Sequence, residues 1–330
     1  MMNAYARLLA KPQAVAMMLL IVFACGKIYA QVSSNANTVV ARVNGDPIYV
    51  IDVEQQIAQV LRGREATPEA LRLMQAQATE QLISRQLILQ ALAEKKIAAN
   101  DREIEVEIDR IRKRLAVTGG TLDEHIKKTG QDIDSLQRTL RWQLSWQRYV
   151  DHYLDEENLQ KFYGKNRRQF DGTELRVAHI LWKVDVNDAQ ALSKAQAQAA
   201  EVRRQITSKE FTFNAAAAKH SQAPTAESGG KIGFITRHDS MPEPFAHAAF
   251  DLEPGQISPP VVTPFGVHLI QCQQVKPGQK PWRDVRAAVK LAATKYLFDW
   301  MSTGKIRDEA DVSYTGALPY FKPGTREVVR

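Results

Sequence analysis

Apolar and polar residues follow two different periods along the chain, and each period predicts a different kind of structure. In Arg176-Val-Ala-His179-Ile-Leu the two kinds alternate, as in a half-buried strand. Upstream, the apolar residues after the Thr67-Pro68 helix start recur at helical spacing. They are Leu71, Met74, Ala78, Leu82 and Leu89. The pattern predicts a strand-containing region that follows a helical one.

The first 165 residues are predicted to be mostly helical. A strand is expected at Val39–Val43, where a tight turn at Asn44-Gly45-Asp46 lets the chain continue as a second extended segment. A helix then starts near Asp52, and further helices are expected where glycines mark the breaks. These helices cover 101–116, Leu122–Thr129, 132–152 and 157–170.

The end of the chain is predicted to return to the N-terminal region. After a Pro/Gly-rich linker, a helix is expected with one apolar face, made of Val285, Val289, Ala292, Tyr296 and Trp300. A short strand follows at Val312–Tyr314, and 316–330 is expected to be irregular. Neither this strand nor Val39–Val43 has a partner nearby in sequence, so we predict that the two share a sheet.

The central region is predicted to be an antiparallel sheet packed against helices. Strands are expected at 179–183, 260–262 and 267–275. Helices are expected at Ala189–Thr207, from about Phe211, and at 241–249. The fold class is therefore α+β, with a mostly helical domain completed by the C-terminal helix.

Charge and the N-terminus limit the choice of partners and compartment. The formal net charge is +7, but basic residues alternate with acidic ones, which is typical of solvated helix faces and predicts no nucleic-acid binding. Arg7 and Lys11 precede the apolar stretch 14–24, which is short for a membrane span and typical of a secretory signal. We expect an exported protein of the bacterial periplasm or envelope, meeting a membrane only through this segment or a lipid anchor.

Three routes of processing are open for residues 1–30. Val22-Phe23-Ala24-Cys25-Gly26 resembles a bacterial lipobox, in which Cys25 would be lipidated, although Phe23 is bulky for that pattern. Alternatively, Ala30 is a small residue that suits an ordinary signal-peptidase cut, or the segment stays uncleaved as an anchor. The lipoprotein form is the first expectation.

The remaining chemistry excludes several classes of site. The two cysteines, Cys25 and Cys272, lie in the signal region and on a strand, so no disulfide is expected between them. The other histidines are dispersed without metal-ligand spacing, and the glycines near Gly230 lack the GK[ST] of a phosphate loop. We expect neither a metal nor a cofactor.

The order of motifs in the central region closely resembles a parvulin-type peptidyl-prolyl cis-trans isomerase domain. The carrying motifs are the strand with His179, Ser228-Gly-Gly-Lys-Ile-Gly-Phe234, Met241-Pro-Glu-Pro-Phe245, Gly255-Gln-Ile-Ser258, and Thr263-Pro-Phe-Gly-Val-His268. The resemblance implies rotation of X-Pro bonds without a cofactor. It places Ile232, Met241 and Phe245 in a proline pocket, with Phe265 as a further wall.

The same resemblance implies that His179 and His268 form a hydrogen-bonded pair, extended by the hydroxyl of Thr263. Neutral imidazole can donate from one ring nitrogen and accept at the other, so such a pair can shape a site without proton transfer. The chain departs from the family at Ala223, where Asp or Cys is common and faces the substrate carbonyl. Gln222 is a neighbouring candidate to replace that polar group.

The flanking regions are similar to the SurA/PrsA group of exported foldases. Val40-Ala-Arg-Val-Asn-Gly-Asp-Pro-Ile48 looks like its opening motif, and 81–89 and 140–144 are similar to its helices. The lipobox-like Cys25 is also similar to lipoprotein isomerases found with exopolysaccharide export systems. We expect a helical chaperone-like domain at 37–165, a parvulin domain at 172–276 and a returning C-terminal segment at 281–315.

This resemblance implies a peptidyl-prolyl isomerase and foldase. Its partners would be unfolded or extended polypeptides that contain proline. The alternative is a non-catalytic periplasmic chaperone or assembly module that binds extended clients, and Ala223 is the feature that favours it.

Overall fold

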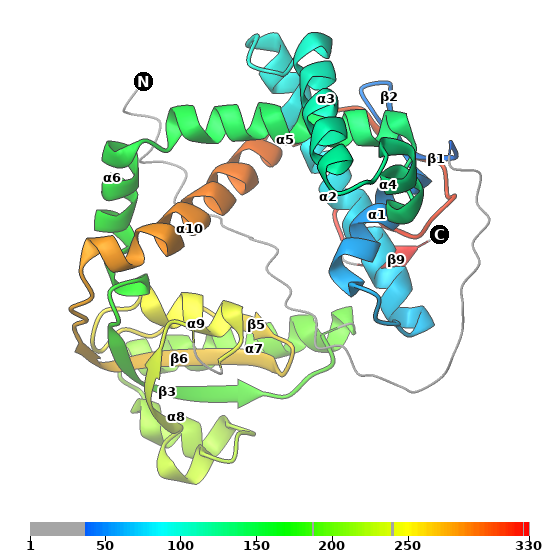
Figure 1. Cartoon of the computed structure of the whole chain (residues 1–330). Coiled ribbons are helices and arrows are strands. Elements are labelled where there is room, and N and C mark those ends of the chain that lie inside the picture. Colours follow the sequence, from blue (N-terminus) through cyan, green and yellow to red (C-terminus); the bar gives the residue numbers. More distant parts are fainter. Residues whose placement is uncertain (1–36, 187, 239–240, 326, 330) are drawn as a thin grey trace. The chain divides into compact units, whose positions relative to one another are not determined.

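The computed structural model describes residues 37–329 apart from 187, 239–240 and 326 (Figure 1). The chain folds into two units. One is Glu156–Ala292, and the other joins residues 37–155 to Ala293–Arg330. The expected cysteine site at Cys25 lies outside the described residues. Within them, no helix combines the length and apolarity that crossing a membrane requires.

The unit Glu156–Ala292 is built on a four-stranded antiparallel sheet with the order β4-β3-β6-β5. Its long central strands are β3 (Glu174–Trp182) and β6 (Gly266–Lys276). The edge strands are β4 (Lys231–Thr236) and β5 (Val261–Thr263). The first strand was predicted at 179–183, with a strand-like alternation from Arg176, and β4 was not predicted, so the sheet is larger than expected.

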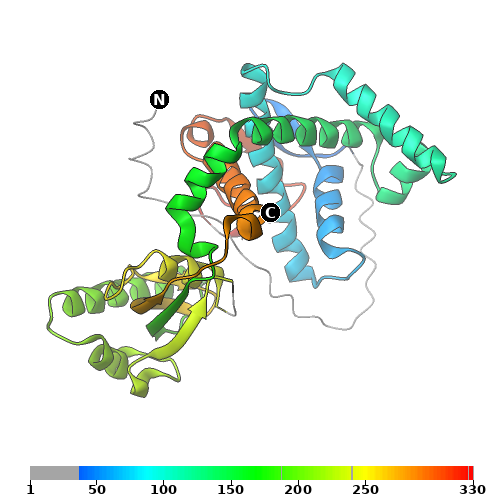
Figure 2. The same ribbon diagram turned by 60° about the vertical axis from the view of Figure 1, so that its left-hand side comes forward.

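Helices cover both faces of this sheet, as can be followed in Figures 1 and 2. On one face lie α7 (Ala189–Thr207) and α8 (Phe213–His220), whose bounds are close to those predicted. Asp188 caps α7 by accepting hydrogen bonds from two backbone N–H groups of its first turn. On the opposite face lies α9 (Glu243–Phe250).

The unit also contains α6 (Glu156–Asn166), which was predicted to belong with the N-terminal helices and to extend to residue 170. The helix ends at Asn166 and continues as the 3-10 turn Arg167–Gln169. The carboxylate of Glu156 accepts hydrogen bonds from Trp282 Nε1 at 2.7 Å and from Arg286 Nε at 2.8 Å. These contacts tie α6 to the start of α10 (Trp282–Ser302), which explains its place in this unit.

The second unit contains the sheet β2-β1-β7, which confirms that the first and last predicted strands share a sheet. In β1 (Val39–Val43), Ala41 lies opposite Tyr314 of β7 (Val312–Tyr314). β2 is Asp46–Tyr49. The antiparallel pairing of segments that lie near opposite ends of the sequence closes this unit.

Four helices of the second unit begin with polar caps at positions close to the expected helix starts. The Thr67 side chain accepts a hydrogen bond from Ala70 N, and Asn100 and Thr121 form capping boxes. The helices are α1 (Val50–Leu61), α2 (Pro68–Glu94), α3 (Asp101–Val117), α4 (Leu122–Thr129), α5 (Ile133–Tyr153) and the short α11 (Lys305–Asp308). Together with the parvulin-like sheet unit, these elements confirm the predicted α+β class.

The buried face of α10 differs from the predicted one. Tyr296 and Trp300 are exposed (54% and 49%), whereas Ala293 and Met301 are buried. Met301 packs with Ile88 and other apolar residues of α2 and α5. The buried stripe continues from Val289 in steps of four residues, so that the predicted stripe through Ala292 turns away from this core.

The tail was expected to be irregular, and this expectation was wrong for part of it. Two short strands, β8 (Tyr320–Phe321) and β9 (Val328–Val329), pair antiparallel. Tyr320 stacks on Tyr314 with ring centres 4.3 Å apart. The Pro/Gly segment between the strands forms a turn in which Thr325 N donates to Lys322 O, so the turn residues connect a hairpin.

Candidate active site

The two predicted histidines meet on one face of the central sheet. In the β3–β6 ladder Leu181 lies opposite His268, and His179 lies opposite Ile270, so the two rings occupy diagonal positions on the same face. The Nδ1 atoms of His179 and His268 are 3.2 Å apart, and the rings are stacked with centres at 5.3 Å. The antiparallel register therefore joins residues that are 89 positions apart in the sequence.

Thr263 extends this pair from the neighbouring strand β5. Its Oγ1 lies 2.8 Å from His268 Nε2 and accepts a hydrogen bond from Phe265 N at 3.1 Å. The turn after Thr263 requires a glycine, because a Cβ on Gly266 would lie 2.1 Å from Trp182 O. The hydroxyl is thus held by the backbone of its own turn.

One assignment of protons uses each of these contacts once. The Thr263 hydroxyl, which already accepts from Phe265 N, donates to His268 Nε2, and His268 Nδ1–H then donates to His179 Nδ1. This leaves the proton of His179 on Nε2. His179 is partly exposed and His268 is 4% exposed, so His179 carries the outer end of the chain.

Both rings are neutral at neutral pH. Burial lowers the pKa of His268 to about 3, with a further contribution from repulsion by His179, and burial also lowers the pKa of His179. Neutral rings are what the proton assignment requires, since an imidazolium has no nitrogen left to accept. In this assignment the network presents a hydrogen-bond donor, the Nε2–H of His179, without a net charge.

Three of the predicted pocket residues share one apolar cluster, and one of them, Phe245, contacts both histidines. Phe245, on α9, is 1% exposed, and its ring meets those of His179 and His268 edge-on, with centres 5.8 and 5.3 Å away. Ile232 and Met241 are partly buried in the same apolar cluster. The structure thus brings together an aromatic wall, two flexible or branched apolar side chains and a polar chain.

A β-bulge directs Ile232 to this side of the sheet. Val177 pairs with Gly233 and the next residue, Ala178, pairs with Lys231, so Ile232 is the extra residue on β4. Gly233 has φ +104°, which a side chain would strain. Without the bulge, strict alternation from Ile235 would turn Ile232 to the opposite face.

Phe265 lies apart from the apolar cluster. It is 57% exposed in the turn between β5 and β6, and its backbone N–H is the group that contacts Thr263. The structure therefore places its side chain at the surface beside the network rather than among the buried pocket residues.

The loop that carries Ala223 is bound to β3. Gln222 Oε1 accepts from Lys183 N at 2.6 Å, and Ser221 Oγ accepts from Leu181 N at 3.1 Å. The amide oxygen of Gln222 is therefore engaged by the backbone, so this oxygen does not replace the family's Asp as an acceptor. Ala223 is 6% exposed and adds no polar group.

Two supporting residues carry more weight than their sequence pattern indicated. Ser221 binds the backbone of β3 at Leu181. In the sequence it was notable only because it lies two residues before Ala223, the position that differs from the family. Gly230 O accepts from His179 N at 2.8 Å, and a Cβ on Gly230 would lie 2.2 Å from His179 O. A glycine at position 230 therefore allows the loop to approach β3 closely.

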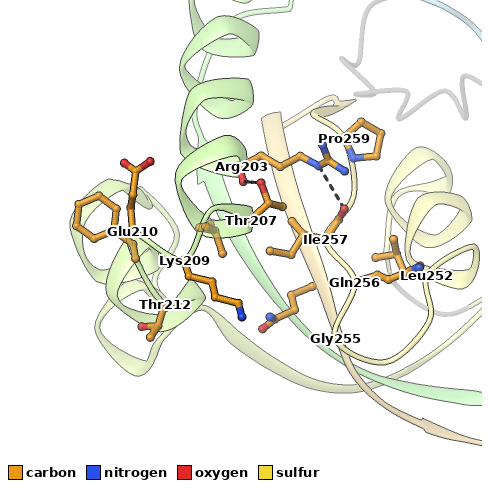
Figure 3. A pocket seen from close by; sticks show the side chains of 13 residues that line it. Arg203, Thr207, Lys209, Glu210, Thr212, Leu252, Gly255, Gln256, Ile257 and Pro259 are labelled. Carbon is orange, nitrogen blue, oxygen red and sulfur yellow. Dashed lines mark hydrogen bonds between the residues drawn. The ribbon is translucent and has the colours of Figure 1, made fainter.

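A large open groove of about 940 Å³ lies elsewhere in this unit, on the α7 side of the sheet (Figure 3). Arg203 and Lys209 line it, and Arg203 Nε donates to Ile257 O at 3.3 Å. Neither histidine lines the groove. Among the described residues, no cluster of three or more His, Cys, Asp or Glu side chains could hold a metal ion.

Comparison with known proteins agrees with this geometry. Residues 179–274 match the PPIC-type PPIASE domain, and residues 1–149 match the SurA-like N-terminal domain. The foldase protein PrsA of Clostridium botulinum strain Loch Maree is similar, with 26% identity over 86% of this chain and 92% of that protein. The chaperone SurA of Aromatoleum aromaticum is 25% identical over 72% of this chain and 56% of that protein.

A solved structure of a peptidylprolyl isomerase, PrsA from Bacillus anthracis, is 20% identical and covers 69% of this chain and 93% of its own, with a TM-score of 0.34. The two domain matches and the relatives lead to one identification. The chain combines a SurA-like N-terminal domain with a PPIC-type, or parvulin, peptidyl-prolyl isomerase domain, and it is similar to PrsA foldases and SurA chaperones.

Proposed function

We propose that this protein is a foldase for exported polypeptides and that its parvulin domain rotates X-Pro bonds at the His179–His268 site. The observation that carries the proposal is the neutral His179–His268–Thr263 chain, which lies against a pocket of Phe245 and its apolar neighbours. Such a site offers a grip for a proline ring beside an uncharged hydrogen-bond donor.

The reaction needs no more than this combination. An X-Pro bond isomerises unaided over roughly 10–100 s, because rotation breaks the amide resonance. At the twisted transition state the carbonyl is no longer conjugated to the nitrogen, and the nitrogen becomes pyramidal. A catalyst has to bind this twisted amide more tightly than the planar one.

Each residue has a distinct part in that binding. Phe245, Met241 and Ile232 hold the proline ring, so that the rest of the peptide rotates relative to it. The Nε2–H of His179 donates to the amide as its resonance is lost. His268 and Thr263 position His179 by fixing its tautomer, and no proton has to leave either ring.

The clients are proposed to be unfolded or extended proline-containing polypeptides in the bacterial periplasm or envelope. The relatives with the names foldase and chaperone support this assignment, as does the signal-like N-terminus. The helical unit would hold extended segments while the parvulin domain acts on their prolines. Lipidation of Cys25 is part of the proposal and predicts a membrane-extracted form that carries the lipid mass on this residue.

One observation favours a second function, in which the parvulin domain binds peptide without turning it over. Ala223 provides no polar group, and the amide of Gln222 is bound to Lys183 N. The protein would then be a chaperone or assembly module that uses the proline pocket for recognition alone.

Exchange spectroscopy by NMR on short Ala-Pro peptides separates the two functions. The purified protein is compared with Ala223→Asp and with the double variant Met241→Ala/Phe245→Ala. Acceleration by wild type that is lost in the double variant supports the isomerase. No acceleration by wild type, with a gain in Ala223→Asp, supports the binding module. In both cases, suppression of client aggregation by the helical unit should survive the double variant.

A further inference from the structure

An ion pair with a buried arginine lies next to the proposed proline pocket, and neither of its residues has been given a role so far. Arg237 is the first residue after β4, and Glu243 is the first residue of α9. Arg237 Nη1 donates to Glu243 Oε2 at 2.7 Å, and Nη2 donates to Oε1 at 2.6 Å. The pair is therefore bidentate, which fixes both the distance and the relative plane of the two groups.

The pair closes the segment that carries one wall of the pocket. Met241 lies between the two charged residues in sequence, and Phe245 follows Glu243 by two positions on α9. The helix has no side-chain N-cap, because its N-cap residue is Pro242. The carboxylate of Glu243 suits the first turn of a helix, but it is the guanidinium of Arg237 that ties this turn to the strand.

The arginine of this pair is buried, whereas the side chain of Glu243 is 38% exposed. The side chain of Arg237 is 8% exposed, whereas that of Arg168, which pairs with Glu253, is 34% exposed. Taking a guanidinium out of water is unfavourable, and a well-packed apolar pair in its place is often as stable. A gain in stability alone is therefore a weak reason for a charged pair at this position.

We propose that Arg237 and Glu243 are positioning residues for proline isomerisation, which set Met241 and Phe245 against the histidine pair. The inference rests on the proposed function of the pocket and adds the residues that determine its shape. Two parallel hydrogen bonds prevent the start of α9 from rotating about the end of β4. Phe245 then keeps its edge toward both imidazole rings, where a bound proline is gripped.

Lysine in place of Arg237 keeps the charge but loses the bidentate contact, so it tests geometry rather than charge. We expect Arg237→Lys to lower kcat/KM for an Ala-Pro peptide about tenfold, because displacement of groups around a reacting centre has effects of this order or larger. Arg168→Lys is the matched control. It removes an Arg–Glu contact in the same unit but leaves the pocket segment intact, and we expect wild-type activity.

An apolar replacement separates positioning from stability. The double variant Arg237→Met/Glu243→Leu has no buried charge, and we expect its unfolding midpoint to stay close to that of wild type. Its kcat/KM should nevertheless fall as in Arg237→Lys. Wild-type activity in this folded double variant would overturn the proposal, as would equal losses in Arg237→Lys and Arg168→Lys.

NMR spectroscopy tests the positioning role of Arg237 and Glu243 without relying on isomerase activity. The methyl signal of Met241 and the ring signals of His179 and His268 report the pocket directly in NMR spectra of the full protein. They should shift in Arg237→Lys and stay unchanged in Arg168→Lys, even if wild type proves to be a binding module without isomerase activity. Unshifted pocket signals in Arg237→Lys would refute the positioning role, whatever the outcome of the test of function.

Discussion

The two faces of the parvulin sheet have similar burial and different chemistry. On the face covered by α7 and α8, the strands contribute Ala178, Ile180, Val267 and Leu269, all fully buried and all apolar. On the face covered by α9, the neighbouring positions of the same strands include a histidine pair. Because successive side chains of a strand point to opposite faces, neighbouring residues of β3 and β6 serve either the apolar core or the histidine site.

The chemical face has a requirement that the other face lacks. Polar groups that leave water must find hydrogen-bond partners, or their burial destabilises the fold. The contacts of His268 to His179 and Thr263 meet this requirement while both rings remain neutral. The buried site is therefore stable only while both rings are uncharged. Because acid protonates the rings, lowering the pH should destabilise this face.

Truncation of one phenylalanine on each face should show the largest difference between the two faces. Phe213 and Phe245 are 4% and 1% exposed on opposite faces. Truncation of either to Ala should cost about 3–5 kcal/mol of unfolding free energy, because each leaves a cavity. Only Phe245→Ala should also lower kcat/KM, by about a hundredfold, since it removes the wall that holds the proline.

Urea unfolding and peptide exchange, measured under conditions where both variants remain folded, check this pair. Milder truncations, Phe213→Leu and Phe245→Leu, provide the comparison if an Ala variant does not fold. Equal losses of kcat/KM in the folded variants on both faces would contradict the division of labour between them.

The second difference between the faces is their response to pH. Because the folded pKa of His268, about 3, lies below the ordinary value of 6.5, protonation favours the unfolded chain. The stabilising contribution of neutral His268 is complete above about pH 6.5 and is lost as the pH falls toward 3. The free energy of unfolding should fall in this window by up to about 1.4 kcal/mol per pH unit from this group.

Denaturant titrations across this window test the expectation. His268→Gln removes the titrating group and should flatten the dependence. An undiminished slope in His268→Gln would show that other groups determine the acid sensitivity.

Local signals predicted a large part of this fold. The apolar periodicity of Ala189–Thr207 gave α7 its bounds, and the long-range pairing of β1 with β7 followed from strands without local partners. The predicted α+β fold class and the predicted parvulin domain were also confirmed. In each case the residues of the element itself carry the information.

The features that sequence reasoning missed depend on contacts between elements. Strand β4 was not predicted, since Gly233 interrupts its pattern, and only the pairing with β3 shows that a bulge lies beside this glycine. The Arg237–Glu243 pair joins a strand end to a helix start across a loop, so no periodicity indicates it. The buried face of α10 was misjudged because it depends on how Met301 packs with α2 and α5.

The smallest expected effect concerns Thr263, whose hydroxyl ends the polar chain. Thr263→Val keeps the shape of this 2% exposed residue and removes one hydrogen-bond partner of His268. The stability cost should be about 1 kcal/mol, with a fall in kcat/KM of several-fold, because the tautomer of the histidine pair is no longer fixed from that end.

The ring nitrogens report this change more directly than the rate does. In ¹⁵N NMR spectra, wild type should show His268 protonated at Nδ1 and His179 at Nε2, as the proton assignment requires. Thr263→Val should give a mixture of tautomers, and Thr207→Val, at an exposed position on the α7 face, should give the wild-type pattern. A single, unchanged tautomer in Thr263→Val would mean that the two imidazoles orient each other without the hydroxyl, and Thr263 would then belong with the packing of the sheet.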